Sequence, residues 1–330
     1  MCNMKFRLIE SNGTDPWRNL AAEACMLDAA RDTFTFFLWQ NAHTVVIGKN
    51  QNPWRETRLA ALEADGGKLA RRQTGGGAVY HDLGNLNFTF AAPNEIYDVH
   101  RQLSVIVDAV KSFGISAEFT GRNDIEAQGR KFSGNAFCSR REMSLHHGTL
   151  LIRSDMTVLS KYLQPSKAKL KAKGVESVGS RVVNLTEFNN ALTVEAMKEA
   201  LFHQFCREYG CQAAVETAES AVDGDKWEEY TNLYSSWEWR IGQTPQFETS
   251  LEDRFVWGSA ELAFSAKNGI IVEGRVYSDA LDSGFIDEMN SHLIGCRTEE
   301  NALLSALSAG ADTPLKRQIA ADVAGLLKNL

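Results

Sequence analysis

The sequence predicts an α+β fold, with mixed sheets packed against helices, followed by a small α+β domain at the C-terminal end. Strand-like runs rich in aromatic and β-branched residues alternate with helical segments that begin at capping residues. The pattern changes near residues 242–249, after which strand-like runs give way to a series of helical ones. The 330 residues are enough for about two domains. We therefore expect a larger domain over residues 1–245 and a smaller one over residues 246–330.

The first helix of the chain is the most clearly marked element. Asp15 is a favourable N-cap and Pro16 suits the first helical position, so a helix is predicted through the apolar run that follows. A strand over residues 4–11 precedes it. The aromatic and β-branched runs 34–41 and 44–50 are expected to be paired strands joined by a short turn.

The remaining elements follow from the same signals. Gly66 and Gly67 should stop a helix over residues 53–64, and Gly114 should end an amphipathic helix over residues 96–113. Residues 116–154 resemble a run of short antiparallel strands. Further helices are expected at 156–165, 194–209 and 227–234, strands at 254–267 and 269–279, and three helices after them. The lysine-rich segment 166–185 has no periodic apolar residues and is expected to be a mobile loop.

Composition excludes several classes of protein. The net charge of -7 argues against broad binding of nucleic acid, which requires a basic surface. No run approaches the roughly 20 apolar residues that span a bilayer. The six cysteines are scattered without a Cys-x-x-Cys pair, so we expect reduced thiols and a cytoplasmic location. No signal-peptide pattern is visible at the N-terminus.

The stretch from Leu69 to Phe90, LARRQTGGGAVYHDLGNLNFTF, places three consecutive glycines between two arginines and a His-Asp pair. It lacks the Gly-Lys-Ser/Thr ending of a Walker A loop, and Tyr80 stands where a dinucleotide fingerprint needs its third glycine. A β-bulge or a tight hairpin is the simpler explanation of a glycine pair. Bare backbone N–H groups beside an arginine fork also suit a phosphate group.

RRQTGGGAVYHD closely resembles the signature of lipoate–protein ligases. The resemblance continues through GRNDI, GRKFSGNAF, HHGTLL, VGSRVVNL and SSWEW, in order and over nearly the whole chain. It implies the biotin/lipoate ligase fold with a C-terminal accessory domain. It also implies an enzyme that makes lipoyl-AMP from lipoate and ATP with Mg²⁺. The lipoyl group then passes to a lysine of an apo lipoyl domain, in 2-oxoacid dehydrogenase complexes or in the glycine cleavage H protein. The sequence leaves open whether lipoate or octanoate is preferred.

The resemblance also implies the residues of the site. Lys131 matches the family lysine that contacts both the acyl carbonyl and the adenylate phosphate. Asp124 is a candidate for the adenylate or for Mg²⁺, with turn capping as the alternative. The ATP site would be formed by Arg72, Gly77, Ala78, Val79, Tyr80 and Lys131, and the lipoyl site by Lys131, Leu20, Trp39, Val46 and His81. A loop that closes over the adenylate would contain Lys173, Ser177, Ser180 and Arg181.

Two alternatives come from other kinds of protein. An octanoyl- or lipoyltransferase of the same fold passes the acyl group through a cysteine thioester, but the matching stretch, LQPSKAK, has Ser166 after Pro165. Cys138 lies close to the Lys131 motif, where a small buried hydrophobe is the simpler explanation. A biotin–protein ligase fits less well, because its glycine-rich signature and accessory domain differ. The second alternative is a non-catalytic lipoate-binding protein.

Overall fold

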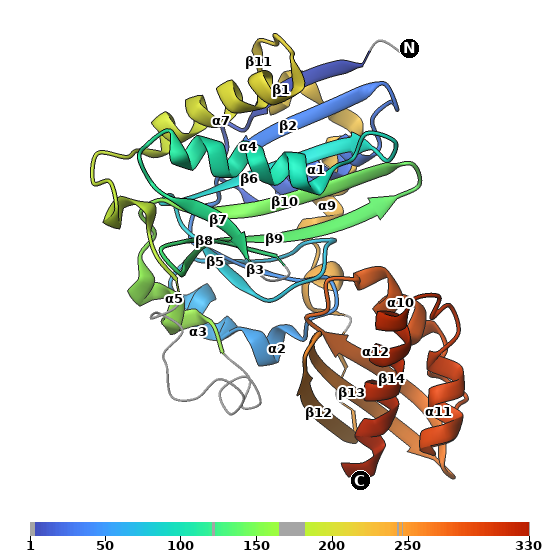
Figure 1. Cartoon of the computed structure of the whole chain (residues 1–330). Helices are drawn as coiled ribbons and strands as arrows, with labels where there is room; N and C mark the ends of the chain where they lie inside the picture. Colours follow the sequence, from blue (N-terminus) through green and yellow to red (C-terminus); the bar gives the residue numbers. More distant parts are fainter. Residues whose placement is uncertain (1–3, 121–122, 165–181, 243, 246, 330) are drawn as a thin grey trace.

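The computed structural model describes residues 4–120, 123–164, 182–242, 244–245 and 247–329. A larger α+β body is followed by a smaller one at the C-terminal end (Figure 1). The mixed α+β class predicted from the sequence is thus confirmed. Among the helices of these residues, none combines the length and apolar character needed to cross a membrane.

An eight-stranded mixed sheet forms the centre of the larger body, in the order β11-β1-β2-β6-β10-β9-β8-β7. β1 runs parallel to β2 and β11, and the other neighbours are antiparallel. The strands are β1 (Lys5–Glu10), β2 (Thr33–Trp39), β6 (Asn85–Pro93), β7 (Ala117–Thr120), β8 (Asp124–Ala127), β9 (Arg130–Arg140), β10 (Met143–Leu151) and β11 (Val215–Thr217).

Helices cover both faces of this sheet (Figure 1). On one face α4 (Val99–Lys111) and α7 (Val194–Tyr209) pack over Phe34, Phe36 and their neighbours. On the other face α1 (Pro16–Leu27) and α9 (Gly224–Ser235) pack over Phe37 and Trp39. Every residue of β2 is buried, because side chains on both sides of the strand meet a helical layer.

The predicted ends of two helices are confirmed by their caps. The Asp15 carboxylate accepts hydrogen bonds from the backbone N–H groups of Trp17 and Arg18 at the start of α1. Gly210 ends α7 in the left-handed conformation, with φ of 64°. The helix expected over residues 53–64 is instead two short helices, α2 (Pro53–Glu56) and α3 (Leu59–Ala64), because the extended residue Thr57 forms a β-bridge with Leu163.

A second, three-stranded sheet corrects the predicted hairpin. It has the order β4-β3-β5, from β3 (Thr44–Ile47), β4 (Lys68–Arg71) and β5 (Val79–His81). The expected pairing of runs 34–41 and 44–50 is therefore wrong, since β2 lies in the large sheet and β3 in the small one. Between them Asn41 is fully buried and His43 has φ of 42°, so this connection carries the chain from one sheet to the other.

Short elements complete the larger body. They are α5 (Met156–Tyr162), the 3₁₀ helix η2 (Leu185–Glu187), α8 (Ala218–Ala221) and the π-helical turn η3 (Glu238–Gly242).

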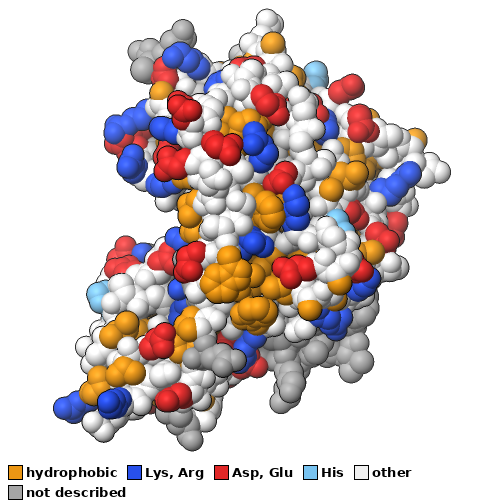
Figure 2. Space-filling model, turned by 180° about the vertical axis from the view of Figure 1, so that it is seen from behind, with side chains coloured by type: hydrophobic (Ala, Val, Ile, Leu, Met, Phe, Trp, Pro, Cys, Tyr) orange, Lys and Arg blue, Asp and Glu red, His pale blue; other side chains and the backbone are white. Residues whose placement is uncertain are grey.

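The smaller body has its own sheet and its own hydrophobic core. Its elements are β12 (Thr249–Phe255), β13 (Gly258–Lys267), β14 (Ile270–Ser278), α10 (Ser283–Ser291), α11 (Glu300–Leu307), α12 (Pro314–Gly325) and η4 (Leu326–Asn329). The three strands form an antiparallel meander. Seen from the opposite side, this body projects from one end of the larger one (Figure 2). We keep the boundary near residue 245 as a proposal, supported by these separate cores.

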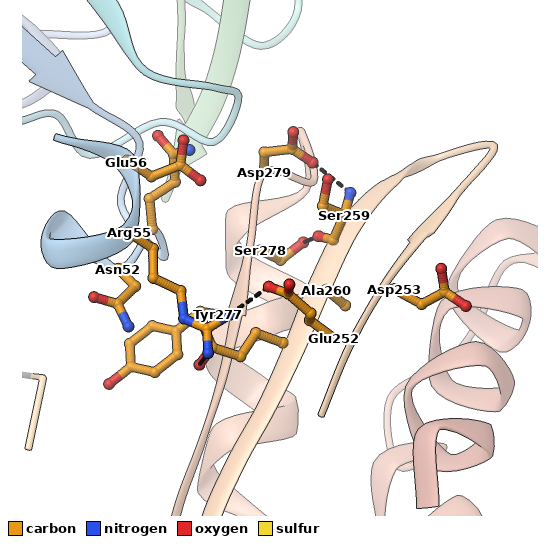
Figure 3. Close-up of a pocket in the computed structure, with 12 residues that line it drawn as sticks. Asn52, Arg55, Glu56, Glu252, Asp253, Ser259, Ala260, Tyr277, Ser278 and Asp279 are labelled. Carbon is orange, nitrogen blue, oxygen red and sulfur yellow. Dashed lines mark hydrogen bonds and ion pairs between the residues drawn. The ribbon is translucent and has the colours of Figure 1, made fainter. Parts of the chain in front are cut away.

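Polar contacts join the two bodies. Arg55 of α2 forms ion pairs with Glu252 of β12 and Glu261 of β13, around a small pocket of about 40 Å³ (Figure 3). Lys49 pairs with Asp287. Asn50 adds two hydrogen bonds, accepting from the backbone N–H of Ser278 at 2.8 Å and donating to the Ser283 carbonyl at 2.9 Å.

The glycine run takes part in the same interface. The N–H of Gly76 donates to the carbonyl of Ala280 at 3.3 Å. A Cβ atom added to Gly75 would lie 2.1 Å from that carbonyl oxygen and 2.7 Å from the carbonyl oxygen of Leu281. Position 75 therefore requires glycine, because the backbone of the smaller body leaves no room there for a side chain.

Gly75→Ala should therefore destabilise the protein by about 1–3 kcal/mol, because the added methyl group collides with backbone that cannot move aside freely. Gly77→Ala is the matched control, since no heavy atom lies within 4 Å of the Cβ position there. Urea unfolding of the two variants and the wild type measures the difference. Equal stability of the two variants would contradict the role given to Gly75.

Candidate functional site

A pocket of about 160 Å³ lies between the small sheet and one face of the large sheet. Helix α1 and strands β2, β3, β5, β6, β9 and β10 all contribute to it. Its lining residues are Leu20, Trp39, Val46, Arg72, Gly76, Gly77, Ala78, Val79, His81, Asn87, Asn123, Lys131, Gly134, Asn135, Ala136, His147, Gly148 and Thr149. Nearly all the described side chains that the sequence analysis assigned to the site are therefore brought together in one cavity.

Arg72 shapes the wall formed by the glycine run. Its buried guanidinium donates to the carbonyl oxygens of Gly75 at 2.7 Å, Gly77 at 2.8 Å and Val46 at 3.2 Å. It also donates to Thr74 Oγ1 at 3.0 Å. Burial lowers the pKa of Arg72 to about 10, so the group is charged at neutral pH. The guanidinium fixes the loop that lines the pocket, and contact between Arg72 and ATP stays a prediction.

The three glycines of the run have different surroundings. Gly75 faces the smaller body. Gly76 has φ of +89°, and a Cβ atom there would lie 2.9 Å from Arg72 Nη2. Gly77 meets nothing within 4 Å and lines the pocket. Gly76 and Gly77 both line the pocket, and of the two Gly77 has the more open backbone.

Lys131 lies on β9, beside a register shift in the pairing of β8 and β9. Its Nζ is 2.7 Å from the carboxylate of Asp124, and both side chains are about one third exposed. Gly134 leaves room for this lysine, since a Cβ atom there would lie 2.9 Å from Nζ. The backbone N–H of Val183 donates to the Lys131 carbonyl at 2.9 Å. The ammonium group of Lys131 is therefore positioned by its ion pair with Asp124, at the more open part of the pocket.

The rest of the pocket is more enclosed and more apolar. Leu20, Trp39, Val46 and His81 are each at most 3% exposed. The Trp39 indole N–H donates to Thr89 Oγ1 at 2.9 Å, which fixes the ring in the wall. Burial lowers the pKa of His81 to about 3, with the charges of Arg72 and His147 adding to the effect. His81 is thus neutral at physiological pH.

Tyr80 differs from its neighbours on β5. Its side chain packs against His43 and Tyr162, and it is absent from the pocket lining. Successive side chains of a strand point to opposite sides, so Val79 and His81 line the pocket while the Tyr80 side chain turns away from it. Tyr80 can therefore contribute to the site only through its backbone atoms.

A series of buried, hydrogen-bonded polar side chains in the wall of the pocket was not predicted from the sequence. Glu23 of α1, 1% exposed, accepts from Thr89 and lies 2.9 Å from His147 Nδ1. His147 Nε2 in turn lies 2.8 Å from Thr74 Oγ1, next to Arg72. These hydrogen bonds connect α1 and β10 to Thr74, which directly precedes the glycine run. A lone glutamate inside the apolar run AAEACML was the available signal, because a buried carboxylate needs partners.

The four residues predicted for the closing loop, Lys173, Ser177, Ser180 and Arg181, lie outside the described residues and stay a prediction.

Among the described residues, no three histidine, cysteine or acidic side chains are grouped as they would be around a metal ion. Asp124, whose carboxylate pairs with Lys131, belongs to no such group.

Cys138 is a poor candidate for a nucleophile. Its side chain packs beside Met143 and Leu145. Burial raises the pKa of its thiol to about 12, so almost none of it is thiolate at neutral pH.

Comparison with known proteins agrees with this geometry. A model described as the lipoyl protein ligase A/B catalytic domain matches residues 15–206, and one described as the bacterial lipoate protein ligase C-terminus matches residues 244–323. The lipoate-protein ligase A of Psychrobacter cryohalolentis is 42% identical over 306 residues, which cover 90% of each chain.

Two solved structures extend the comparison. P. falciparum LipL1 in complex with lipoate is 32% identical, with a TM-score of 0.85 over 98% of this chain and 99% of that one. A lipoate-protein ligase A bound with ATP is 25% identical, with a TM-score of 0.62 over 73% of this chain and 100% of that one. Together with the two family models, they show that this chain belongs to the lipoate–protein ligase A family.

Proposed function

We propose that this chain activates lipoate with ATP to form lipoyl-AMP, and then transfers the lipoyl group to a lysine of a carrier protein. One observation carries the proposal. A single pocket joins an enclosed apolar wall, a loop of bare backbone beside Arg72, and the ammonium group of Lys131. These parts suit an acyl chain, a nucleotide phosphate and the carboxylate that must react with it.

Adenylation joins two anions, so the site must offset their repulsion. A lipoate carboxylate oxygen attacks the α-phosphorus of ATP, the bond to the β-phosphate oxygen breaks, and pyrophosphate leaves. Lys131 is the group in the pocket that would contact both reacting parts, exchanging its ion pair with Asp124 for the carboxylate and phosphate oxygens. A positioned cation stabilises the charge that develops in this step.

Transfer needs a good leaving group and an enclosed site. The neutral amine of a carrier lysine attacks the acyl carbon of lipoyl-AMP, AMP leaves, and the amine loses a proton. The apolar wall of Leu20, Trp39 and Val46 would hold the acyl chain away from water, which otherwise hydrolyses the mixed anhydride. The loop with Lys173, Ser177, Ser180 and Arg181 remains our proposal for the segment that closes over the adenylate.

Mg²⁺ is proposed as the companion of ATP. Magnesium commonly binds one or two carboxylates together with substrate phosphates and water. Asp124 fits this pattern as a carboxylate 2.7 Å from Lys131, the lysine that we propose contacts the phosphate. Bound there, the ion would neutralise charge on the phosphates of ATP.

The acceptors that we propose are apo lipoyl domains of 2-oxoacid dehydrogenase complexes and the glycine cleavage H protein. Their acceptor lysine has to reach the acyl carbon beside Lys131. That side chain is about one third exposed, so this part of the pocket is open to an approaching lysine.

We expect carrier modification to require ATP. Incubation of the protein with lipoate, Mg²⁺ and an apo lipoyl domain, with and without ATP, is read by the intact mass of the domain. The mass should rise by one lipoyl group only with ATP, and EDTA should suppress the rise. Equal modification without ATP from an acyl-carrier donor would favour the transferase instead.

Lys131→Ala should lower the rate of lipoyl-AMP formation by about 100- to 1,000-fold, which corresponds to about 2–4 kcal/mol of lost transition-state stabilisation. Lys267→Ala, at an exposed lysine of the smaller body, is the matched control and should keep the wild-type rate. ATP–pyrophosphate exchange dependent on lipoate measures this step alone. A near-normal rate for Lys131→Ala would remove this lysine from the mechanism.

Cys138→Ala should keep most of the activity, because adenylation supplies the leaving group and no acyl-enzyme is needed. Mass spectrometry of the enzyme stopped during turnover tests the same point. An acyl thioester trapped on Cys138 would contradict the adenylate route.

A further inference from the structure

We propose that Cys206 and Cys211 form a redox-active dithiol, which reduces a low-molecular-weight disulfide such as oxidised glutathione and itself becomes an intramolecular disulfide. The pair lies at the C-terminal end of α7, outside the pocket, and the inference does not depend on the proposed function. It rests on the turn that brings the two residues together, on the contact between their sulfur atoms, and on the different surroundings of the two thiols.

The turn that ends α7 brings the two cysteines together. Gly210 follows the helix in the left-handed conformation, and the backbone N–H of Cys211 donates to the carbonyl of Cys206 at 3.0 Å. This hydrogen bond is typical of a Schellman motif, in which the side chains of the two bonded residues commonly contact each other. The contact is usually made by two apolar side chains, and here it is made by two thiols.

The two sulfur atoms are already in contact. Cys211 Sγ donates to Cys206 Sγ at 3.5 Å. Both side chains are half-buried, and the neighbouring residues Gly210 and Gln212 are exposed, so the pair lies at the protein surface. A disulfide bond of about 2.05 Å requires two residues whose backbones are close together. The backbone hydrogen bond meets this condition, so rotation of the side chains can bring the sulfur atoms into bonding distance.

The surroundings of the two thiols differ. Burial raises the pKa of the Cys211 thiol to about 12, and the hydrogen bond to Cys206 and the charge of a Cys206 thiolate add to the effect. Cys211 therefore keeps its proton and donates it in the hydrogen bond to Cys206. A thiolate is stabilised by such a donor. Cys206 is thus the attacking thiol, and Cys211 is the thiol that closes the disulfide.

The exchange takes two steps. The Cys206 thiolate attacks one sulfur of the small disulfide, the S–S bond breaks, and a first thiolate leaves. Cys206 carries no charge in this mixed disulfide, which removes one cause of the raised pKa of Cys211. Cys211 then loses its proton and attacks Cys206 Sγ, and a second thiolate leaves. The protein thiols lose two electrons to the small disulfide, and their two protons pass to the two released thiolates.

The dithiol lies on the side of the large sheet away from the pocket. α7 packs over Phe34 and Phe36, whereas the pocket is on the face that carries Trp39. Oxidation of the pair is therefore separate from the proposed chemistry of the pocket, and it can be measured without lipoate or ATP.

Peptide mapping tests the proposal, because trypsin cleaves after Lys198, Arg207 and Lys226 and so separates the two cysteines. The folded protein is equilibrated with glutathione at a series of ratios of oxidised to reduced form, alkylated, and digested without reduction. Peptides 199–207 and 208–226 should be joined by a disulfide at oxidising ratios and should be separate at reducing ones. Separate peptides at every ratio, or glutathione adducts in place of the crosslink, would overturn the proposal.

Single variants test the order of the two steps. Cys211→Ser removes the thiol that closes the disulfide, so a glutathione adduct should accumulate on peptide 199–207. In Cys206→Ser, the adduct on peptide 208–226 should form about tenfold more slowly. Cys296→Ser is the matched control, since Cys296 is a half-buried thiol that donates to the His292 carbonyl instead, and it should form the crosslink as the wild type does. Equal rates of adduct formation in Cys206→Ser and Cys211→Ser would contradict the assigned roles.

Discussion

The buried guanidinium of Arg72 is the constraint on which the site depends. A charge removed from water must be matched by oriented acceptors, and here they are carbonyl oxygens of Val46, Gly75 and Gly77 with the hydroxyl of Thr74. Satisfying these bonds sets the path of the glycine run and ties it to the small sheet. The pocket wall is therefore a consequence of one buried charge and its acceptors.

The same run serves two surfaces at once. Gly76 and Gly77 line the pocket, while Gly75 and Gly76 contact the backbone of Ala280 in the smaller body. A ligand that moves the backbone of Gly77 would also move Gly75 and Gly76, which contact the smaller body. We therefore expect formation of the acyl-adenylate to be coupled to the position of the smaller body through these three consecutive residues.

Local signals in the sequence predicted individual helices and strands better than they predicted which elements pack against one another. Asp15 and Pro16 were enough to place the start of α1, and the resemblance grouped Lys131 with residues that the structure places around the same pocket. The pairing of β2 with β6 could not be read locally, because a buried strand carries no mark of its neighbour. The reason for Gly75 was equally hidden, since the backbone against it lies about 200 residues further along the chain, at Ala280.

A crystal structure of the protein with a non-hydrolysable lipoyl-AMP analogue tests the central claim most directly. The account predicts the acyl chain between Trp39 and Val79, the phosphate beside Lys131, and the nucleotide along the backbone at Gly77. The Arg72 hydrogen bonds to Gly75 and Gly77 should persist in that complex. An analogue bound outside this pocket, or a phosphate remote from Lys131, would contradict the account.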